Sequence, residues 1–419
     1  MSLPKEITPK DKIEAVLTLP GSKSYTHRAL VAAALAEGDS LLTNPLRAED
    51  PELTAQALRL MGAEIHWQKD AIRVRGTGGH WAPVAEPIYL GNSGTSMRFL
   101  TALAALGQGR YCLTGSQRLC ERPMGELLRA LMRLGVAAYA QQHNDCPPII
   151  VHGGLRGGRT RLSGAVSSQY VSALLFIGPL APQDVEIEVT GELVSRPYVD
   201  LTLEVLSAFG ISYGREGYRR FHLPAGQRYQ AREYPIEADA SSASYFWAAA
   251  ALTGGRVTIT NLSLDSAQGD IDFLSVLAQM GCHISALPEG LTLEGGPLKG
   301  LQVDMSSMPD LVPTLAVLAA FAEGVTVITG VSHLRHKESD RLATVAAELR
   351  KLGIEALDVA DGLFIRGGTP QSAVIDTYQD HRLAMSFAVA GLKIPGLKIN
   401  DPEVVNKSFP EFWDIFERL

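Results

Sequence analysis

The chain has 419 residues, of which 46% are hydrophobic and 20% are charged, a composition typical of globular proteins. Its 38 lysines and arginines against 45 aspartates and glutamates give a net charge of −7, which argues against general binding of nucleic acids. Four scattered cysteines, with no CxxC and no zinc-binding spacing, indicate a reducing compartment and no metal site. The N-terminus lacks the apolar stretch of a signal peptide, so we expect a cytoplasmic protein without a membrane anchor. Any anion site must be a local concentration of cations.

Six segments rich in alanine and leucine follow one another along the chain, and each predicts a buried helix. Most begin with a Ser, Thr or Asp that suits a helix N-cap, and all are apolar on nearly every side. The fifth continues into the longest apolar stretch, 311–328, where Pro313 and Gly324 predict a helix, a turn and a strand rather than a membrane span. The six segments are 24–35, 93–106, 167–177, 241–252, 308–321 and 380–392.

A second marker keeps the same spacing. A glycine between two hydrophobic residues ends a helix at intervals of 73, 75, 71 and 72 residues, and a positive φ would suit each of these glycines. Short β-branched runs at 185–191, 256–262 and 324–331 predict strands between the helices. The glycines are Gly62, Gly135, Gly210, Gly281 and Gly353.

The two markers together predict six repeats of about 70 residues, in which helices alternate with strands of an α/β (α+β) fold. Proline-containing junctions at 18–23 and 232–239 divide the six repeats into two groups of three. We therefore expect a first domain at 20–234 and a second domain made of 1–19 and 235–419. The first nineteen residues are expected to complete the last sheet of the second domain, and a ligand site is expected in the cleft between the domains.

The stretch GSKSYTHR at 21–28 stands at the start of the first buried helix. It lacks the upstream glycine of a P-loop, but backbone N–H groups at a helix start attract anions. Lys23 adds a positive charge, Ser24 can cap the helix or donate a hydrogen bond, and Arg28 lies one turn further on the same face. The stretch alone leaves two interpretations open, an ordinary helix cap or an anion site.

Further helix starts in the first half of the chain carry polar residues that capping explains only in part. Gly94 lies in a glycine-rich turn that would let a ligand approach the backbone, unless the turn is only a tight turn. Arg122 precedes Pro123 at another helix start, where an exposed arginine is the alternative. The remaining candidates are Ser167, Ser168, Gln169 and Ser195.

In the second half, Asp310 begins a nearly apolar helix, as either an N-cap or a base held in the cleft. Lys337, Glu338 and Arg341 lie within five residues, as either a solvated ion pair or part of a site. Arg382 and Lys407 add two more cations. Unpaired cations gathered in one cleft would repel one another by roughly 4 kcal/mol per close pair, so the cluster makes sense if it holds anions. We expect two small anionic substrates.

These residues together resemble the EPSP synthase (3-phosphoshikimate 1-carboxyvinyltransferase) family. The resemblance covers essentially the whole chain and rests on an ordered set of motifs that includes PGSKSYTHRAL, LGNSGTSMR, ERPMGELL, SSQYVSALL, DASSASYF, DMSSMPD, HKESDRL, YQDHRLAMSF and NKSFPEF. It implies a two-domain inside-out α/β barrel of six βαβαββ-type units, three in each domain. It also implies transfer of the enolpyruvyl group of phosphoenolpyruvate to the 5-hydroxyl of shikimate 3-phosphate, without metal or organic cofactor, by a cytoplasmic monomer that is a target of glyphosate.

The resemblance also implies a role for each matching residue. Asp310 would take the proton from the attacking hydroxyl, Glu338 would protonate and deprotonate the methylene carbon, and Lys23 would stabilise phosphate charge. The implied ligands of shikimate 3-phosphate are Lys23, Ser24, Arg28, Ser167, Ser168, Gln169, Ser195, Asp310, His333 and Lys337. The implied ligands of phosphoenolpyruvate are Lys23, Gly94, Arg122, Gln169, Arg341, Arg382 and Lys407.

One position departs from the family pattern, and two other functions stay open. His333 stands where the family has an asparagine, and its imidazole would make affinity sensitive to pH. The sister family, UDP-N-acetylglucosamine enolpyruvyl transferase, shares the fold, but it is expected to have Lys-Asn in place of Lys23-Ser24 and a cysteine at the position of Gln117. A non-catalytic anion-binding relative is the other alternative, although it would be expected to have lost Asp310 and Glu338.

Overall fold

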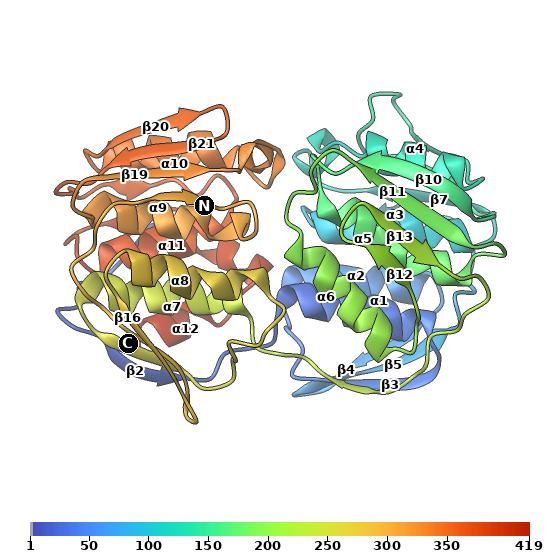
Figure 1. Ribbon diagram of the computed structural model, residues 1–419, viewed down its shortest axis with the longest axis horizontal. Coiled ribbons are helices and arrows are strands. Elements are labelled where there is room, and N and C mark those ends of the chain that lie inside the picture. Colours follow the sequence, from blue (N-terminus) through green and yellow to red (C-terminus); the bar gives the residue numbers. More distant parts are fainter. Residues whose placement is uncertain (1–2) are drawn as a thin grey trace. The chain divides into compact units, whose positions relative to one another are not determined.

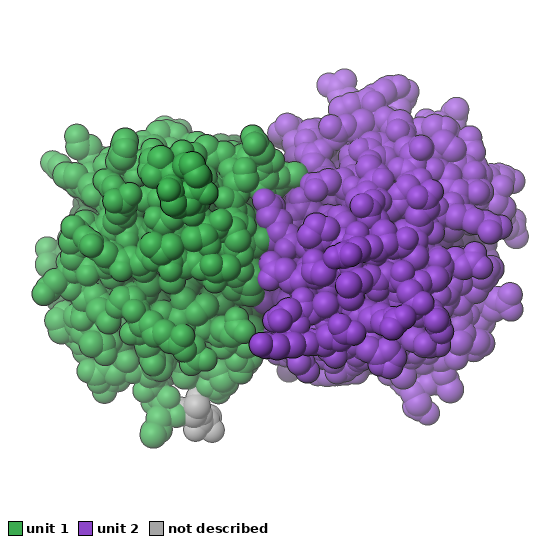
Figure 2. Space-filling view, turned by 90° about the horizontal axis from the view of Figure 1, so that it is seen from below, with its two compact units in different colours: residues 1–20, 238–419 green, residues 21–237 purple. Residues whose placement is uncertain are grey.

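The computed structural model of the chain describes residues 3–419, which form α-helices and small β-sheets throughout (Figure 1). The chain folds into two compact units (Figure 2). Unit 2 is Gly21–Glu237, and unit 1 combines the segment up to Pro20 with Ala238–Leu419. Each unit has a hydrophobic core of its own.

Each unit is built around three helices that are buried along almost their whole length. They match the six predicted apolar segments, and five of the six begin at a Ser or Asp whose side chain accepts a hydrogen bond from a backbone N–H in the first turn. The buried helices are α1 (Lys23–Leu35), α3 (Gly94–Leu103) and α5 (Ser168–Ile177) in unit 2, and α7 (Ala240–Thr253), α9 (Val312–Phe321) and α11 (His381–Gly391) in unit 1.

The second helix of each repeat has a more mixed surface and packs beside the first. These helices are α2 (Glu49–Leu60), α4 (Gly125–Arg133), α6 (Pro197–Ala208), α8 (Phe273–Gln279), α10 (Arg341–Lys351) and the short α12 (Phe412–Phe416). Each of the five glycines that mark the repeat has a positive φ, between 79° and 115°, so the predicted backbone turn after each helix is confirmed. A side chain is strained in this region of φ, which explains why glycine recurs there.

In unit 2 each sheet has a parallel pair of strands followed by two antiparallel partners, and the sheets cover the helices from outside (Figure 1). β14 (Glu233–Pro235), the last strand of the unit, joins the first sheet beside β3 (Glu37–Thr43), so the end of the unit completes its beginning. The other strands are β4 (Glu64–Trp67) and β5 (Ala71–Thr77), then β6 (Ile88–Tyr89), β7 (Arg110–Thr114), β8 (Ala138–Ala140) and β9 (Ile149–His152), then β10 (Gly158–Ser163), β11 (Val185–Thr190), β12 (Gly214–Glu216) and β13 (Arg220–Leu223).

Two sheets of unit 1 repeat this pattern, and its last sheet has one parallel pair with a single antiparallel partner among the described residues. The N-terminal segment contributes to two of these sheets. β1 (Lys5–Glu6) pairs with β23 (Lys398–Ile399) in the last sheet, as predicted, whereas β2 (Glu14–Leu17) pairs with β15 (Arg256–Ile259) in the first. The pairing of β2 with the first sheet is an addition to the prediction, which named only the last sheet. The other strands are β16 (His283–Leu287) and β17 (Gly290–Glu294), then β18 (Gln302–Asp304), β19 (Val325–Thr329), β20 (Glu355–Val359) and β21 (Gly362–Arg366), and finally β22 (Val374–Ile375).

The longest apolar stretch of the sequence forms α9, a turn at Gly324 and β19, as predicted. Along the described part of the chain, no helix combines the length and apolar character that crossing a membrane requires.

Candidate active site

In unit 2 the predicted site residues gather at the N-terminal ends of the buried helices, where backbone N–H groups and the helix dipole favour anions. Ser22, not Ser24, caps α1, because the Ser22 hydroxyl accepts the hydrogen bond from the Tyr25 N–H at 3.4 Å. Lys23 follows the cap, and its Nζ lies 3.7 Å from the carboxylate of Asp50 on α2. Ser24 is half-buried in the same turn.

Arg28 is buried one turn further along α1. Its guanidinium donates hydrogen bonds to the Thr202 hydroxyl at 2.8 Å, to the Ser24 carbonyl at 2.9 Å and to the Tyr198 carbonyl at 2.8 Å. Burial lowers the pKa of Arg28 to about 10, so the guanidinium keeps its charge at neutral pH. These neutral oxygens fix the orientation of the cation without neutralising it.

Two guanidinium groups lie against the first residue of α3. A β-carbon built onto Gly94 would lie 2.3 Å from Arg98 Nη1 and 2.6 Å from Arg122 Nη2, so a side chain at this position would force the guanidinium groups to shift. Arg122 follows the short 3-10 helix η2 (Leu119–Glu121) and is only 5% exposed, so the alternative of an exposed arginine is wrong. The alternative of a simple tight turn at Gly94 leaves both arginines unexplained.

The start of α5 completes this group. The Gln169 side chain accepts a hydrogen bond from Arg98 Nη1 at 2.9 Å and donates one from Nε2 to the Thr95 hydroxyl at 2.9 Å. Ser167 is the N-cap of α5 and accepts from the Gln169 N–H, as the capping interpretation predicts. Ser168 follows it and is buried. Ser195, in the loop before α6, is also buried and has a φ of 54°, an uncommon conformation for a serine.

In unit 1 a carboxylate lies among three cations. Asp310 belongs to the 3-10 helix η5 (Pro309–Leu311), directly before α9. Its Oδ1 accepts a hydrogen bond from Arg341 Nη1 at 2.7 Å and lies 3.6 Å from Lys337 Nζ, and its Oδ2 accepts from Arg382 Nη2 at 2.9 Å. The N-cap alternative for Asp310 is therefore wrong, and the negative charge is held by cations from two other helix starts.

Arg341 is the centre of this cluster. It is 1% exposed and also donates to Glu338 Oε2 at 2.9 Å and to Asp380 Oδ2 at 2.8 Å. Burial alone would lower the pKa of Arg341, but the carboxylates of Asp380, Glu338 and Asp310 outweigh burial and raise it. The predicted ion pair between Glu338 and Arg341 is present, but it is buried rather than solvated, so it belongs to the cluster and not to an outer helix face.

Two further predicted residues of unit 1 are buried. His333 lies in the 3-10 helix η6 (Ser332–His336), where burial and then the charge of Lys337 lower its pKa to about 4. The imidazole is therefore neutral at physiological pH, and any effect of its protonation on substrate affinity is expected only near pH 4. Lys407 ends the 3-10 helix η7 (Pro402–Lys407) and is only 6% exposed.

The sequence-based assumption that the gathered cations have no carboxylate partners is wrong for unit 1. Arg341 contacts three carboxylates, and Arg382 and Lys337 both contact Asp310, so the cluster already contains much of its own countercharge. Sequence reasoning overlooked this because the partners lie up to 72 residues apart in the chain. An anion that binds here therefore competes with these carboxylates for the cations, and it does not simply relieve a repulsion between unpaired cations.

Several residues of these clusters were missed as site candidates. Arg98 and Thr95 share the helix start with Gly94, and the spacing of four residues between Gly94 and Arg98 was the available signal. Asp380 both caps α11 and binds Arg341 through two oxygens, and the Tyr245 hydroxyl oxygen accepts a hydrogen bond from Arg382 Nη1 at 3.3 Å. No pattern in the sequence around Asp50 indicated that its carboxylate lies near Lys23.

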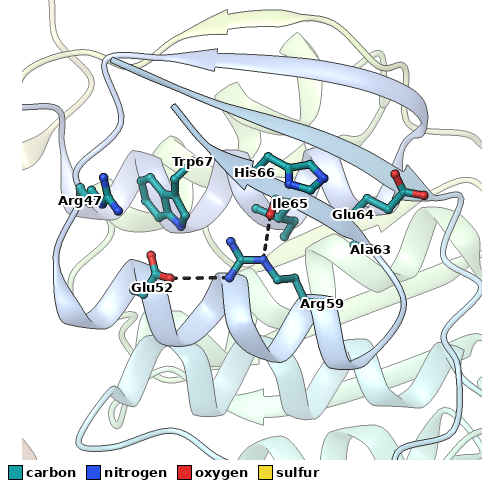
Figure 3. Close-up of a pocket in the computed structure, with 8 residues that line it drawn as sticks. All are labelled: Arg47, Glu52, Arg59, Ala63, Glu64, Ile65, His66 and Trp67. Carbon is teal, nitrogen blue, oxygen red and sulfur yellow. Dashed lines mark hydrogen bonds and ion pairs between the residues drawn. The ribbon is translucent and has the colours of Figure 1, made fainter. Parts of the chain in front are cut away.

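A shallow pocket of about 630 Å³ lies elsewhere in unit 2, between α2 and β4 (Figure 3). Its charged groups contact one another or their own framework, because Arg59 donates to the Ile65 carbonyl at 2.8 Å and lies 3.6 Å from Glu52. Arg47 lies over the Trp67 ring. None of the predicted site residues lines this pocket. Within residues 3–419, no group of three or more His, Cys, Asp or Glu could hold a metal ion.

Comparison with known proteins decides the family. The family model of EPSP synthase (3-phosphoshikimate 1-carboxyvinyltransferase) matches residues 7–416, which is nearly the whole chain. The chain belongs to the EPSP synthase family. The resemblance inferred from the motifs is therefore confirmed, and the sister family is not favoured.

Proteins named 3-phosphoshikimate 1-carboxyvinyltransferase are similar to this EPSP synthase family member over their full length. The protein from Syntrophobacter fumaroxidans is 46% identical over 99% of both chains, and that from Methanoculleus marisnigri is 46% identical over 96% of both. The protein from a Nostoc species is 44% identical over 97% of both.

A solved structure of EPSP synthase from Acinetobacter baumannii has the same fold. It matches with a TM-score of 0.81 and 31% sequence identity, over 99% of this chain and 97% of that one. The predicted fold class, a two-domain inside-out α/β barrel of repeated units, is thereby confirmed.

Proposed function

We propose that the two clusters described above bind and react the two substrates of an enolpyruvyl transfer. As a member of its family, the chain transfers the enolpyruvyl group of phosphoenolpyruvate to the 5-hydroxyl of shikimate 3-phosphate. The products are 5-enolpyruvylshikimate 3-phosphate and phosphate, in the pathway to chorismate and the aromatic amino acids. The catalytic roles proposed below rest on one observation, the hydrogen-bonded cluster of Asp310, Glu338, Arg341 and Arg382.

The helix starts of unit 2 supply most of the proposed anion ligands. Shikimate 3-phosphate and phosphoenolpyruvate each carry a phosphate, and phosphates suit helix N-termini with lysine or arginine beside them. Shikimate 3-phosphate would contact Lys23, Ser24, Arg28, Ser167, Ser168, Gln169 and Ser195 in unit 2, and Asp310, His333 and Lys337 in unit 1. Phosphoenolpyruvate would contact Lys23, Gly94, Arg122 and Gln169 in unit 2, and Arg341, Arg382 and Lys407 in unit 1.

Two carboxylates, the partly buried Asp310 and the buried Glu338, would perform the proton transfers. Asp310 takes the proton of the 5-hydroxyl as the oxygen attacks C2 of phosphoenolpyruvate, and the cations around Asp310 stabilise the carboxylate that acts as base. Glu338 delivers a proton to the methylene carbon, which becomes a methyl group in the addition product. Glu338 then removes a proton from that methyl group as phosphate leaves, while Lys23 stabilises the charge of the departing phosphate.

The proposed ligands come from both units, so neither unit alone is expected to turn over the two substrates. We propose that a single copy of the chain, acting in the cytoplasm, is the working form. The pairing of Arg341 with three carboxylates supports a role in which the cluster supplies acid and base as well as charge.

The experiment that tests the function is phosphate release from phosphoenolpyruvate by the purified full-length chain, with no metal added. Shikimate 3-phosphate and UDP-N-acetylglucosamine are offered separately as acceptors. Release that requires shikimate 3-phosphate is the expected result. Release only with the sugar nucleotide would assign the chain to the sister activity, and binding of shikimate 3-phosphate without turnover would assign it to the non-catalytic alternative.

A further inference from the structure

A buried carboxylate that the proposed mechanism does not use is linked through Ser241 to Arg382, a proposed ligand of phosphoenolpyruvate in unit 1. Asp270 belongs to the 3-10 helix η4 (Gly269–Asp272), in the connection between β15 and α8. It is 5% exposed, and its Oδ2 accepts a hydrogen bond from the Ser241 hydroxyl in the first turn of α7. Its Oδ1 has no hydrogen-bond partner among the described residues. Burying a carboxylate with one oxygen unsatisfied costs free energy of folding, so this position calls for an explanation.

Ser241 links Asp270 to the cation that we assign to phosphoenolpyruvate. The Ser241 oxygen accepts a hydrogen bond from Arg382 Nη2 at 3.4 Å, and the same Nη2 donates to Asp310 Oδ2 at 2.9 Å. Arg382 Nη1 is held by the Tyr245 hydroxyl. The guanidinium is therefore held on one side by α7 and on the other by the proposed base.

The segment that carries Asp270 is itself fixed to the start of α7. Gln268 donates from Nε2 to the Ala238 carbonyl at 2.7 Å and accepts at Oε1 from the Ala240 N–H at 3.1 Å. Its amide thus spans Asp239, the N-cap of the helix. The hydrogen bonds of Gln268 join the segment that carries Asp270 to the start of α7, which carries Ser241. They therefore fix the position of Asp270 relative to Ser241.

The charges around Asp270 come from three helix starts. Burial raises the pKa of Asp270 to about 7, the positive charge of Arg382 on α11 opposes this, and the negative charges of Asp310 on η5 and Asp239 on α7 add to it. Ser241 opposes the rise through its hydrogen bond. The carboxyl therefore changes its charge near neutral pH, next to the contact between Ser241 and Arg382.

We propose that Asp270 is a positioning residue for phosphoenolpyruvate, which acts through Ser241 to orient the Arg382 guanidinium. The ionised carboxylate accepts a hydrogen bond from the Ser241 hydroxyl, which turns the lone pairs of the hydroxyl oxygen toward Arg382. Without this second anchor, the nearby Asp310 draws the guanidinium toward itself. The inference rests on the proposed role of Arg382, and it adds a residue that does not touch substrate.

The test measures KM for each substrate separately in Asp270→Ala, Ser241→Ala and the double variant. Each single variant is expected to raise KM for phosphoenolpyruvate about tenfold, the scale of a lost hydrogen bond to a charged group, and to leave KM for shikimate 3-phosphate within about twofold. The double variant is expected to resemble the worse single variant, because both residues act through one contact. Asp265→Asn, an exposed aspartate in the same connection, is the matched control and should change neither KM.

A pH profile separates this role from a merely structural one. A protonated Asp270 can donate to Ser241 and then competes with Arg382 for the same oxygen. KM for phosphoenolpyruvate in the parent chain is therefore expected to fall as the pH rises through about 7. The asparagine of Asp270→Asn has nearly the same shape and does not titrate. In this variant, KM for phosphoenolpyruvate should no longer show the part of the pH dependence that comes from ionisation of Asp270. The ionisation of phosphoenolpyruvate itself is common to both proteins and cancels in the comparison.

Three results would overturn the inference in a parent chain that is active. They are an unchanged KM for phosphoenolpyruvate in Asp270→Ala, an equal rise in KM for both substrates, and additive effects in the double variant. If Asp270→Ala does not fold, Asp270→Asn decides, since an unchanged pH profile in that variant contradicts the proposal. A parent chain without turnover would instead refute the proposed function, so the two failures are distinguishable.

Discussion

The two units hold their cations in different ways. In unit 2, Arg28 and Arg98 donate to hydroxyl, carbonyl and amide oxygens, which are neutral groups. In unit 1, Arg341 and Arg382 donate to carboxylates. Lys23 of unit 2, which lies 3.7 Å from Asp50, is intermediate between the two arrangements. The same repeated fold thus presents helix starts with two kinds of electrostatics.

The difference indicates a division of labour. A guanidinium oriented by neutral oxygens keeps its full charge for an incoming phosphate, which suits unit 2 to binding. A guanidinium surrounded by carboxylates holds acids and bases in fixed positions, which suits unit 1 to proton transfer.

Loss of the proposed base should have the largest effect on turnover. Asp310→Asn is expected to lower kcat by a factor of about 10²–10⁴, the usual contribution of a positioned base. Steady-state phosphate release measures it, and Asp272→Asn, an exposed aspartate of unit 1, is the control. An Asp310→Asn protein that turns over at the parent's rate would remove Asp310 from the mechanism.

Loss of a buried arginine should destabilise unit 1 more than unit 2. Arg341→Gln leaves three carboxylates without their shared partner and should lower the free energy of unfolding by about 3–5 kcal/mol. Arg28→Gln leaves only neutral acceptors without a donor, and we expect a loss of about 1–3 kcal/mol. Urea unfolding followed by circular dichroism measures both, and a larger loss for Arg28→Gln would contradict the comparison.

A methyl group at Gly94 should weaken phosphoenolpyruvate binding. It would push against the guanidinium groups of Arg98 and Arg122, so Gly94→Ala is expected to raise KM for phosphoenolpyruvate roughly tenfold, the effect of about 1.4 kcal/mol. Gly214→Ala is the control, since a β-carbon there meets its neighbour at an ordinary 3.7 Å. An unchanged KM in Gly94→Ala would show that these arginines do not hold this substrate.

The smallest effect is expected for His333. Its pKa of about 4 keeps the imidazole neutral above pH 6, so His333→Asn should leave the pH dependence of KM for shikimate 3-phosphate unchanged between pH 6 and 9. Because the unfolded chain binds a proton near pH 6.5 and the folded chain only near 4, the histidine's contribution to stability is lost as pH falls between these values. Thermal unfolding should therefore show a steeper acid loss in the parent than in His333→Asn.

The repeats and most elements were predictable because their causes are local. The glycines with positive φ, the Ser and Asp caps and the apolar helices all leave signals within a few residues. The burial of Arg122 and the ion pairs of Arg341 with Asp310 and Asp380 were not predictable, because they depend on contacts between residues far apart in sequence. The role of β2 was missed for the same reason, since its partner β15 lies more than two hundred residues away.

The division of labour is tested most directly by incorporation of deuterium into the methylene group of phosphoenolpyruvate, with shikimate 3-phosphate present in heavy water. Reversible protonation at this carbon is the step assigned to Glu338. The parent chain is expected to incorporate deuterium, whereas Glu338→Gln should bind both substrates by calorimetry and incorporate none. Incorporation by Glu338→Gln at the parent's rate would contradict the account, because the proton would then come from a group other than Glu338.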